Sequence, residues 1–282
     1  MTGEPVSGKA APQRASFYFS AHEDDWQLFM NPPAFRDVLD GVKCVFVHVT
    51  AGDAGLGSGN GGRKHPLYLA REVGAESAIR FMADQDYRPP VEKIVTAVAC
   101  NGHALRRITY RNTVAYFLRL PDGNPEGTGY PGTGNRSLKL FAEGRIGTFA
   151  AIDGSTSYEG WSELVAALRD LITMERGPAP AIDLHIPDPD PAINPGDHAD
   201  HVLTAKAVLD AAKGLAGTRI IKHLGYASGS KPENLFGEER DMKCAVFAVT
   251  LAGVLAFDHE TAWRHYDRSF VGRNYWRALE FG

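Results

Sequence analysis

The sequence predicts an α/β fold built around a mostly parallel β-sheet. Short runs rich in β-branched and aromatic residues alternate with longer helical patterns along the 282-residue chain, which is typical of successive βαβ units. The first run lies at residues 16–20 (SFYFS), and a denser one lies at residues 43–50 (KCVFVHVT). Residues 1–15 are small and polar, and no interdomain linker follows them. We therefore expect a weakly ordered N-terminus and a single domain over residues 16–282.

The other elements follow from the same patterns. An apolar stripe predicts a helix over residues 66–83, and Pro32 and Pro33 divide the helical stretch 26–40 into two pieces. Further helices are expected at residues 161–174 and 201–212, and further strands at residues 93–99, 113–120, 181–185 and 218–224. Long loops, which often carry function, are expected at residues 51–65, 121–160 and 186–197.

The composition bounds the possible partners. The chain has 30 lysines and arginines against 34 acidic residues, a balance that predicts no affinity for nucleic acid. The longest apolar stretch, residues 244–257, is too short to span a bilayer. We expect a buried helix or a strand–turn–strand there and no transmembrane segment, with peripheral membrane contact left open. The arginine- and aromatic-rich run at residues 263–277 is interpreted as a terminal helix and tail.

The cysteines and the first residues indicate the compartment. The three cysteines are widely spaced, and residues 1–16 contain no apolar leader. Both observations favour a reducing, cytoplasmic location. The sequence leaves the oligomeric state open.

A histidine and two acids come directly after the first predicted strand. Residues 21–25 read AHEDD, and the carboxyl ends of strands are where α/β sheets bind ligands. The adjacent acids Asp24 and Asp25 repel each other, and a cation beside them relieves that repulsion. His22 and Asp25 can point at one ion from a tight turn. Alternatively, Asp24 or Asp25 only caps the helix that follows.

A second polar motif lies between a proline-rich loop and a predicted helix. Residues 197–201 read DHADH, and His198 and His201 occupy neighbouring positions of a helical turn. Aspartates beside ligating histidines fix the tautomer of the ring. Together the two motifs offer two histidines and one carboxylate as ligands, with positions left for water and substrate, as in a catalytic zinc site. That ligand set is His22, Asp25 and His201, with Asp24 placed to take a proton from water.

These motifs resemble those of the PIG-L/LmbE-like family of zinc-dependent N-acetylglucosamine deacetylases. The usual signatures of the family are alanine or proline–His–Pro–Asp–Asp–Glu and His–Pro–Asp–His. Residues 50–55 (TAGDAG), the helix over residues 69–82 and residues 120–123 (LPDG) also resemble family segments, so the resemblance covers about residues 16–210. It implies a three-layer αβα, Rossmann-like sandwich.

The resemblance also implies roles for single residues. One catalytic Zn²⁺ would be bound by His22, Asp25 and His201. Asp24 would be the general base, and His198, oriented by Asp200, would stabilise the oxyanion or protonate the leaving amine. The expected reaction is hydrolysis of the amide of an N-acetyl- or N-acylglucosaminyl group, which releases acetate and a free amine.

The residues expected to contact substrate include two departures from the family pattern. Glu23 stands where proline is usual, and Trp26 stands where glutamate is usual. Arg71 lies in the sugar-contacting position of the family, and Asp122 belongs to its Leu–Pro–Asp–Gly segment. We expect Trp26 and Tyr130 to offer stacking surfaces beside the metal.

The glycine-rich loops suggest a substrate class. Residues 52–62 and 121–135 flank the predicted site and would frame a wide mouth for a glycosylated small molecule. This composition resembles the teicoplanin-type glycopeptide antibiotic deacetylases. If the loops are only surface excursions, a smaller substrate is expected, either an aminoglycoside or a thiol-cofactor precursor. Two further alternatives are a non-catalytic sugar-binding homologue and an Fe(II) site for oxygen activation.

Overall fold

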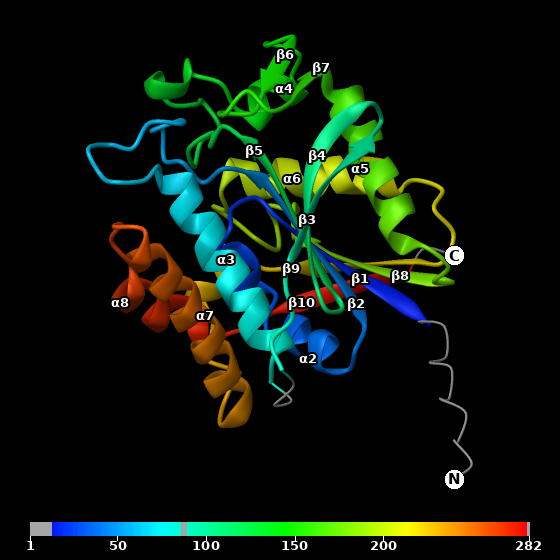
Figure 1. Cartoon of the computed structure of the whole chain (residues 1–282), viewed down its shortest axis with the longest axis vertical. Coiled ribbons are helices and arrows are strands. Elements are labelled where there is room, and N and C mark those ends of the chain that lie inside the picture. The colour runs from blue at the N-terminus through cyan, green and yellow to red at the C-terminus, as the bar shows by residue number, and fades with distance from the viewer. Residues whose placement is uncertain (1–12, 86–88, 281–282) are drawn as a thin grey trace.

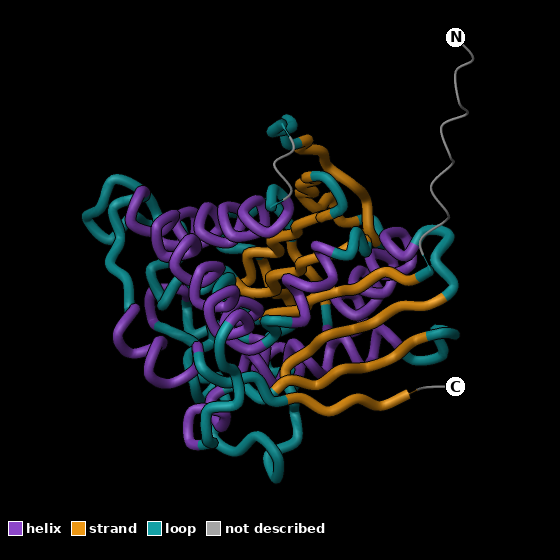
Figure 2. Tube along the Cα trace, turned by 90° about the horizontal axis from the view of Figure 1, so that it is seen from below, coloured by secondary structure: helices purple, strands orange, loops and turns teal. Residues whose placement is uncertain are grey.

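The computed structural model describes residues 13–85 and 89–280, which form one eight-stranded sheet between two layers of helices (Figure 1, Figure 2). The strand order is β10 (Trp276–Glu280), β9 (Thr218–His223), β8 (Ala181–Pro187), β1 (Arg14–Ser20), β2 (Lys43–Thr50), β5 (Thr113–Leu120), β4 (His103–Tyr110) and β3 (Ile94–Cys100). The strands from β9 to β5 in this order are parallel, whereas β10, β4 and β3 are antiparallel to their neighbours. The predicted α/β fold with a mostly parallel sheet is confirmed.

Helices cover both faces of the sheet (Figure 1). One face carries α1 (Asp25–Phe29), α2 (Pro33–Leu39), α3 (Leu67–Ala83) and α7 (Glu238–Ala256). The other carries α4 (Leu138–Ala142), α5 (Trp161–Arg176) and α6 (Ala199–Ala212). The architecture is therefore a three-layer sandwich, with a small hairpin, β6 (Thr148–Ala150) and β7 (Ser157–Glu159), beside α4.

Alternation along the central strands builds the two cores. Successive side chains of a strand point to opposite faces of the sheet. Phe17 and Phe19 of β1 accordingly lie in the core beneath α5 and α6, while Tyr18 lies in the core beneath α3 and stacks on Phe46 of β2 at 5.2 Å. Because both faces are covered, these strands are apolar almost throughout, which made them visible in the sequence.

Two glycines let α3 and α7 pack backbone to backbone. A Cβ atom at Gly74 would lie 2.6 Å from the carbonyl oxygen of Thr250, and one at Gly253 would lie 2.7 Å from the Cα of Gly74. Neither Gly74 nor Gly253 can therefore be replaced by a residue with a side chain unless the two helices move apart. The contact brings the end of α7, and the segment 259–266 that follows it, towards the start of α3.

The structure also differs from the sequence-based expectations. The strand β4 was not predicted, and the expected loop over residues 121–160 contains α4, β6 and β7. The run at residues 263–277 forms α8 (Trp263–Tyr266), a further turn and the start of β10 instead of a helix and tail. Residues 1–12 lie outside the described residues, but β1 begins two residues earlier than expected, at Arg14. The apolar stretch at residues 244–257 belongs to α7, and no helix in the described ranges is long and apolar enough to cross a membrane.

Candidate metal centre

The candidate site lies at the carboxyl ends of the parallel strands. His22 follows β1, Asp122 follows β5, and the loop after β8 leads into α6. In the sheet, β1 lies between β2 and β8, so the connections on its two sides diverge, which is where open α/β sheets bind ligands. The fold therefore brings the two sequence motifs, residues 21–25 and 197–201, together.

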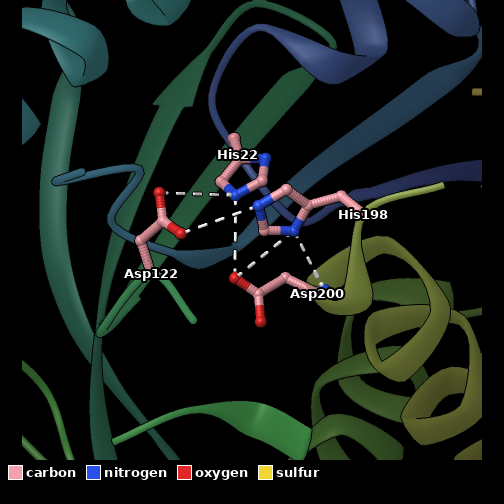
Figure 3. A group of neighbouring side chains, drawn as sticks. All are labelled: His22, Asp122, His198 and Asp200. Atoms are coloured by element: carbon pink, nitrogen blue, oxygen red, sulfur yellow. Dashed lines mark hydrogen bonds and ion pairs between the residues drawn. The ribbon is translucent and has the colours of Figure 1, made fainter. Parts of the chain in front are cut away.

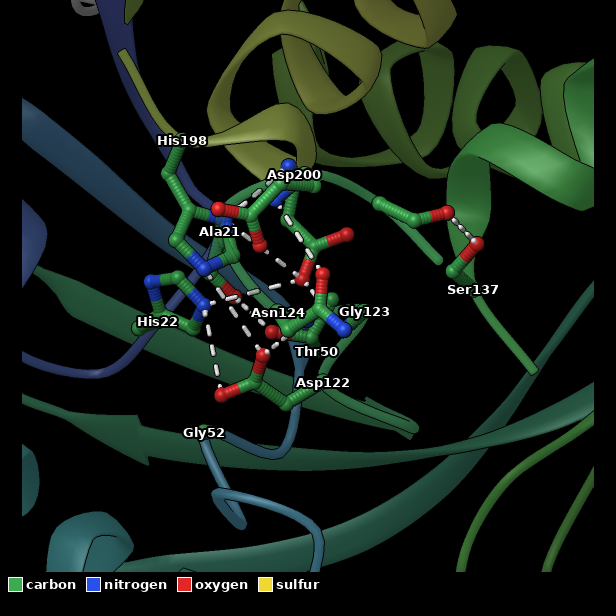
Figure 4. A network of polar contacts seen from close by, with 12 residues as sticks. Ala21, His22, Thr50, Gly52, Asp122, Gly123, Asn124, Ser137, His198 and Asp200 are labelled. Atoms are coloured by element: carbon green, nitrogen blue, oxygen red, sulfur yellow. Dashed lines mark hydrogen bonds and ion pairs between the residues drawn. The ribbon is translucent and has the colours of Figure 1, made fainter. Parts of the chain in front are cut away.

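Hydrogen bonds fix the turn after β1. The carbonyl of Ala21 accepts bonds from both the N–H and the hydroxyl of Thr50, each at 2.8 Å (Figure 4). The N–H of His22 donates to Oδ2 of Asp25 at 2.7 Å. Asp24 stands at the N-cap position of α1, but its side chain makes no capping hydrogen bond. The turn therefore serves to hold His22 and Asp25 together, and the helix-cap interpretation is not supported.

Three buried side chains converge on one point. Nδ1 of His22 lies 3.6 Å from Oδ2 of Asp25, and Nε2 of His201 lies 3.2 Å from Oδ1 of Asp25. One ligand atom of each residue lies within 4.8 Å of those of the others. These are the three residues that the sequence motifs offered as a ligand set, and two imidazoles with one carboxylate form a common set for catalytic zinc.

A fourth residue of the second motif orients His201. Asp197 accepts a hydrogen bond from Nδ1 of His201 at 2.9 Å, which turns Nε2 towards Asp25. Asp197 is itself held by the side chain of Asn194 at 2.7 Å and the N–H of Tyr226 at 3.1 Å. Asp197 was not among the predicted site residues, although its position four residues before His201 was a usable signal.

The far side of the His22 ring faces two carboxylates. Nε2 of His22 lies 3.7 Å from Oδ2 of Asp200 and 3.8 Å from Oδ2 of Asp122 (Figure 3). Oδ2 of Asp200 also accepts the N–H of Gly123 at 2.8 Å. Neither distance from Nε2 of His22 is a hydrogen bond, and among the described residues this buried atom has no hydrogen-bond partner. The two nearby negative charges still favour a proton on this nitrogen, which leaves Nδ1 available on the side of Asp25. Asp122, expected to bind substrate, thus lies beside a ligand ring.

His198 is held as a neutral hydrogen-bond donor. Its Nδ1 accepts the backbone N–H of Asp200 at 3.1 Å, so the proton of the neutral ring is on Nε2, which lies 3.8 Å from Oδ1 of Asp122. Burial and the neighbouring rings of His22 and His201 lower the pKa of His198 to about 3. Asp200 therefore orients His198 through its backbone N–H, because its carboxylate, 3.8 Å from Nδ1, is too far for a hydrogen bond.

The electrostatics of the cluster suit a cation. Burial opposes ionisation of Asp25, but His201 and His22 hold its pKa well below the usual range. Burial also lowers the pKa of His201, yet Asp197 and Asp25 raise it to about 10. Within the described residues, Nε2 of His201 is buried without a hydrogen-bond partner, a costly state that a metal–nitrogen bond would relieve. The residues present therefore fit a divalent metal ion such as zinc.

The predicted base lies at a cavity beside this cluster. Asp24, whose side chain is 19% exposed, contacts the guanidinium of Arg71. Both residues line a cavity of about 360 Å³, together with the glycine-rich loop at residues 56–63 and the segment 259–266. Arg71, expected to contact a sugar, thus lies where it can do so, although it is already bound to protein acids.

One predicted substrate residue is misplaced and one aromatic was missed. Trp26 is 0% exposed and packs on Phe46 at 4.7 Å, so the expectation that it stacks on substrate is wrong: this side of α1 faces the sheet. Tyr130 is half-buried against Gly55 of the glycine-rich loop. Tyr226, which the sequence analysis missed, is 38% exposed and lies edge-on to His201 at 5.3 Å.

No protein-family model matches the chain, and no curated protein matches its sequence. Among solved structures, it is similar to a deacetylase triple mutant of the teicoplanin biosynthetic pathway, at 14% identity over 90% of this chain and 88% of that one, with a TM-score of 0.48. It is also similar to N,N′-diacetylchitobiose deacetylase from Pyrococcus horikoshii, at 15% identity over 95% and 84% of the two chains and a TM-score of 0.49.

A third similar structure is that of the A40926 pseudoaglycone deacetylase, at 16% identity over 92% of this chain and 87% of that one, with a TM-score of 0.46. Each of the three is named as a deacetylase.

Proposed function

We propose that the chain is a metal-dependent deacetylase of the PIG-L/LmbE-like kind, which hydrolyses the amide of an N-acetylglucosaminyl group. The observation that carries this proposal is the convergence of three buried ligands, His22, Asp25 and His201, next to a cavity lined by a carboxylate, Asp24. Three protein ligands leave coordination positions open, as catalysis requires and a structural site does not.

The chemistry follows from the roles of the neighbouring residues. When bound, Zn²⁺ supplies polarisation of the amide carbonyl and lowers the pKa of water towards about 7. Asp24 takes the proton of the attacking water as the new C–O bond forms, and it delivers a proton to the amine as the C–N bond breaks. The neutral His198 donates a hydrogen bond from Nε2 to the developing oxyanion. The products are acetate and the free amine.

The substrate proposed is an N-acetylglucosaminyl group carried by a glycopeptide antibiotic precursor. A cavity of about 360 Å³ suits one acetylated sugar. The glycine-rich loop forms one side of that cavity, which leaves the remainder of a large substrate outside it. The alternative is a smaller substrate, either an aminoglycoside or a thiol-cofactor precursor, which would also fit the sugar cavity.

Acetate release from a panel of substrates tests both the deacetylase activity and the choice of a glycopeptide substrate. The panel contains an N-acetylglucosaminyl glycopeptide, an N-acetylated aminoglycoside, a thiol-cofactor precursor and a simple N-acetylglucosaminide. We expect zinc-dependent acetate release that a chelator abolishes, with the glycopeptide turned over best. Turnover of the small compounds alone would reject the glycopeptide substrate, and no acetate from any of them would reject the deacetylase.

A further inference from the structure

Glu23 is a buried acid for which the proposed chemistry has no use. It stands between the ligand His22 and the base Asp24, at the position where proline is usual in the family that the motifs resemble. Its side chain is 1% exposed, and a carboxylate buried to this extent is rarely found without a charged partner.

The partner of Glu23 is Arg71, which also holds Asp24. Nε of Arg71 lies 3.1 Å from Oε2 of Glu23, Nη1 donates to the carbonyl of Gly52 at 3.3 Å, and Nη2 contacts Oδ1 of Asp24. The contacts with Gly52 and Asp24 are hydrogen bonds, whereas the contact with Glu23 is an ion pair without hydrogen-bond geometry. Because the guanidinium is planar and rigid, its contact with Glu23 sets the angle at which it meets Asp24.

The glycine-rich loop closes over this pair. A Cβ atom at Gly52 would lie 2.7 Å from Oε2 of Glu23 and 2.8 Å from Cζ of Arg71, and the backbone there has a φ of +50°. Only glycine allows both the close approach and this conformation. The loop thus confines the guanidinium of Arg71 to a position between Glu23, which is buried, and Asp24, which lines the cavity.

We propose that Glu23 is a positioning residue that holds Arg71 across Asp24, so that Oδ1 of Asp24 is engaged and Oδ2 is presented to the reacting water. This inference rests on the proposed function. A proline at position 23 has no carboxylate to pair with Nε of Arg71. Without Glu23, the guanidinium can turn and pair with both oxygens of Asp24, which takes away the base.

Kinetics of Glu23 and Arg71 variants test the proposal. For Glu23→Ala and Glu23→Pro, kcat for acetate release is expected to fall about 10- to 100-fold, the size of effect that misplacing a catalytic group produces. KM and zinc content should change little. Glu23→Gln, which keeps a side-chain oxygen beside Nε but loses the charge, should retain more kcat than Glu23→Ala. If both residues act as one unit, the double variant Glu23→Ala/Arg71→Met should be no slower than Arg71→Met alone.

A matched control separates positioning from general loss of stability. Glu175 is also a buried acid paired with arginine, but it lies on α5, and Glu175→Gln should lower the melting temperature without lowering kcat. Wild-type kcat and KM in Glu23→Ala, or losses that multiply in the double variant, would overturn the positioning role while leaving the deacetylase intact. A wild-type protein that releases no acetate from any substrate would overturn both.

Discussion

At the residue scale, the site depends on which nitrogen of each ring is free. His201 donates a hydrogen bond from Nδ1 to Asp197, and His22 turns Nε2 towards Asp200 and Asp122, so that the other nitrogen of each ring faces Asp25. Because the tautomers are already fixed, metal binding does not have to supply the free energy of orienting the rings and selecting those tautomers. The acids around the ligands are therefore part of the metal site.

Replacing Asp197 tests this dependence. Asp197→Ala should weaken zinc binding about 10- to 100-fold, because the ring of His201 loses its orientation and its preferred tautomer. A competition titration against a chromophoric chelator measures the affinity. Asp190, which lies on the same loop and binds Arg277 near the surface, provides the control variant Asp190→Ala. Equal zinc affinity in both variants would show that Asp197 has no part in the site.

The sequence motifs predicted that the candidate metal ligands would converge, but they misplaced or missed some of the residues around them. His22, Asp25 and His201 belong to short motifs next to predicted strands, and strand ends of a parallel sheet meet at one edge, so their proximity followed from the fold. The burial of Trp26 did not follow, because a five-residue helix such as α1 gives too little periodicity to show which side faces the sheet. Tyr226 comes to the site from beyond β9, without a motif of its own.

At the element scale, the crossing of α3 and α7 positions one wall of the cavity. The segment 259–266, which lines the cavity, directly follows α7. Residues 56–63 precede α3 and line the same cavity. The close glycine contact between these helices therefore links the packing of the core to the shape of the candidate substrate site.

A single methyl group should disturb this crossing. Gly253→Ala is expected to lower the free energy of unfolding by about 1–3 kcal/mol, because its Cβ would overlap the backbone of α3. Urea denaturation followed by circular dichroism measures the change. Ala252→Ser, on the exposed side of the same helix, should stay within about 0.5 kcal/mol of the wild type. An equally small effect of Gly253→Ala would contradict the close packing.

The unpredicted strand β4 had a signal in the sequence. Asn101 and Gly102 stand between β3 and β4, and Asn-Gly is the strongest short hairpin signal because both residues tolerate positive φ. Their φ angles are 47° and 81°, as such a turn requires. The antiparallel strand β10 had no such signal, because its place at the sheet edge depends on pairing with β9, far from it in the chain.

At the scale of the whole molecule, the buried acid Glu175 connects one helix, α5, to three strands of the sheet. Glu175 of α5 binds Arg107 of β4 at 2.6 Å and Lys43 of β2 at 2.7 Å, and it accepts the hydroxyl of Tyr116 of β5. Burial opposes ionisation of Glu175, but its hydrogen bonds from Arg107, Lys43 and Tyr116 lower its pKa to about 2. Folding therefore favours the charged form of this group.

The lowered pKa of Glu175 makes the stability of the protein depend on pH. A folded-state pKa of about 2 against an ordinary value of 4.5 means that the stabilisation is complete above about pH 4.5 and is lost as the pH falls towards 2. The shift corresponds to about 3 kcal/mol. Glu175→Gln should thus be less stable than the wild type at pH 7, and the difference should shrink below pH 4.5. Urea unfolding at pH 7, 4.5 and 3 measures it, and a difference that does not change with pH would refute the assignment.

The proposed function requires different roles for two adjacent acids: Asp25 binds the metal, and Asp24 takes the proton of the attacking water. The most direct test is to measure zinc content and acetate release together in Asp24→Asn, whose side chain has the same shape and still accepts a bond from Arg71. We predict that zinc content stays near that of the wild type, while turnover falls by about 10²–10⁴-fold with the loss of the general base. Turnover close to that of the wild type, or loss of the metal along with the activity, would contradict the account.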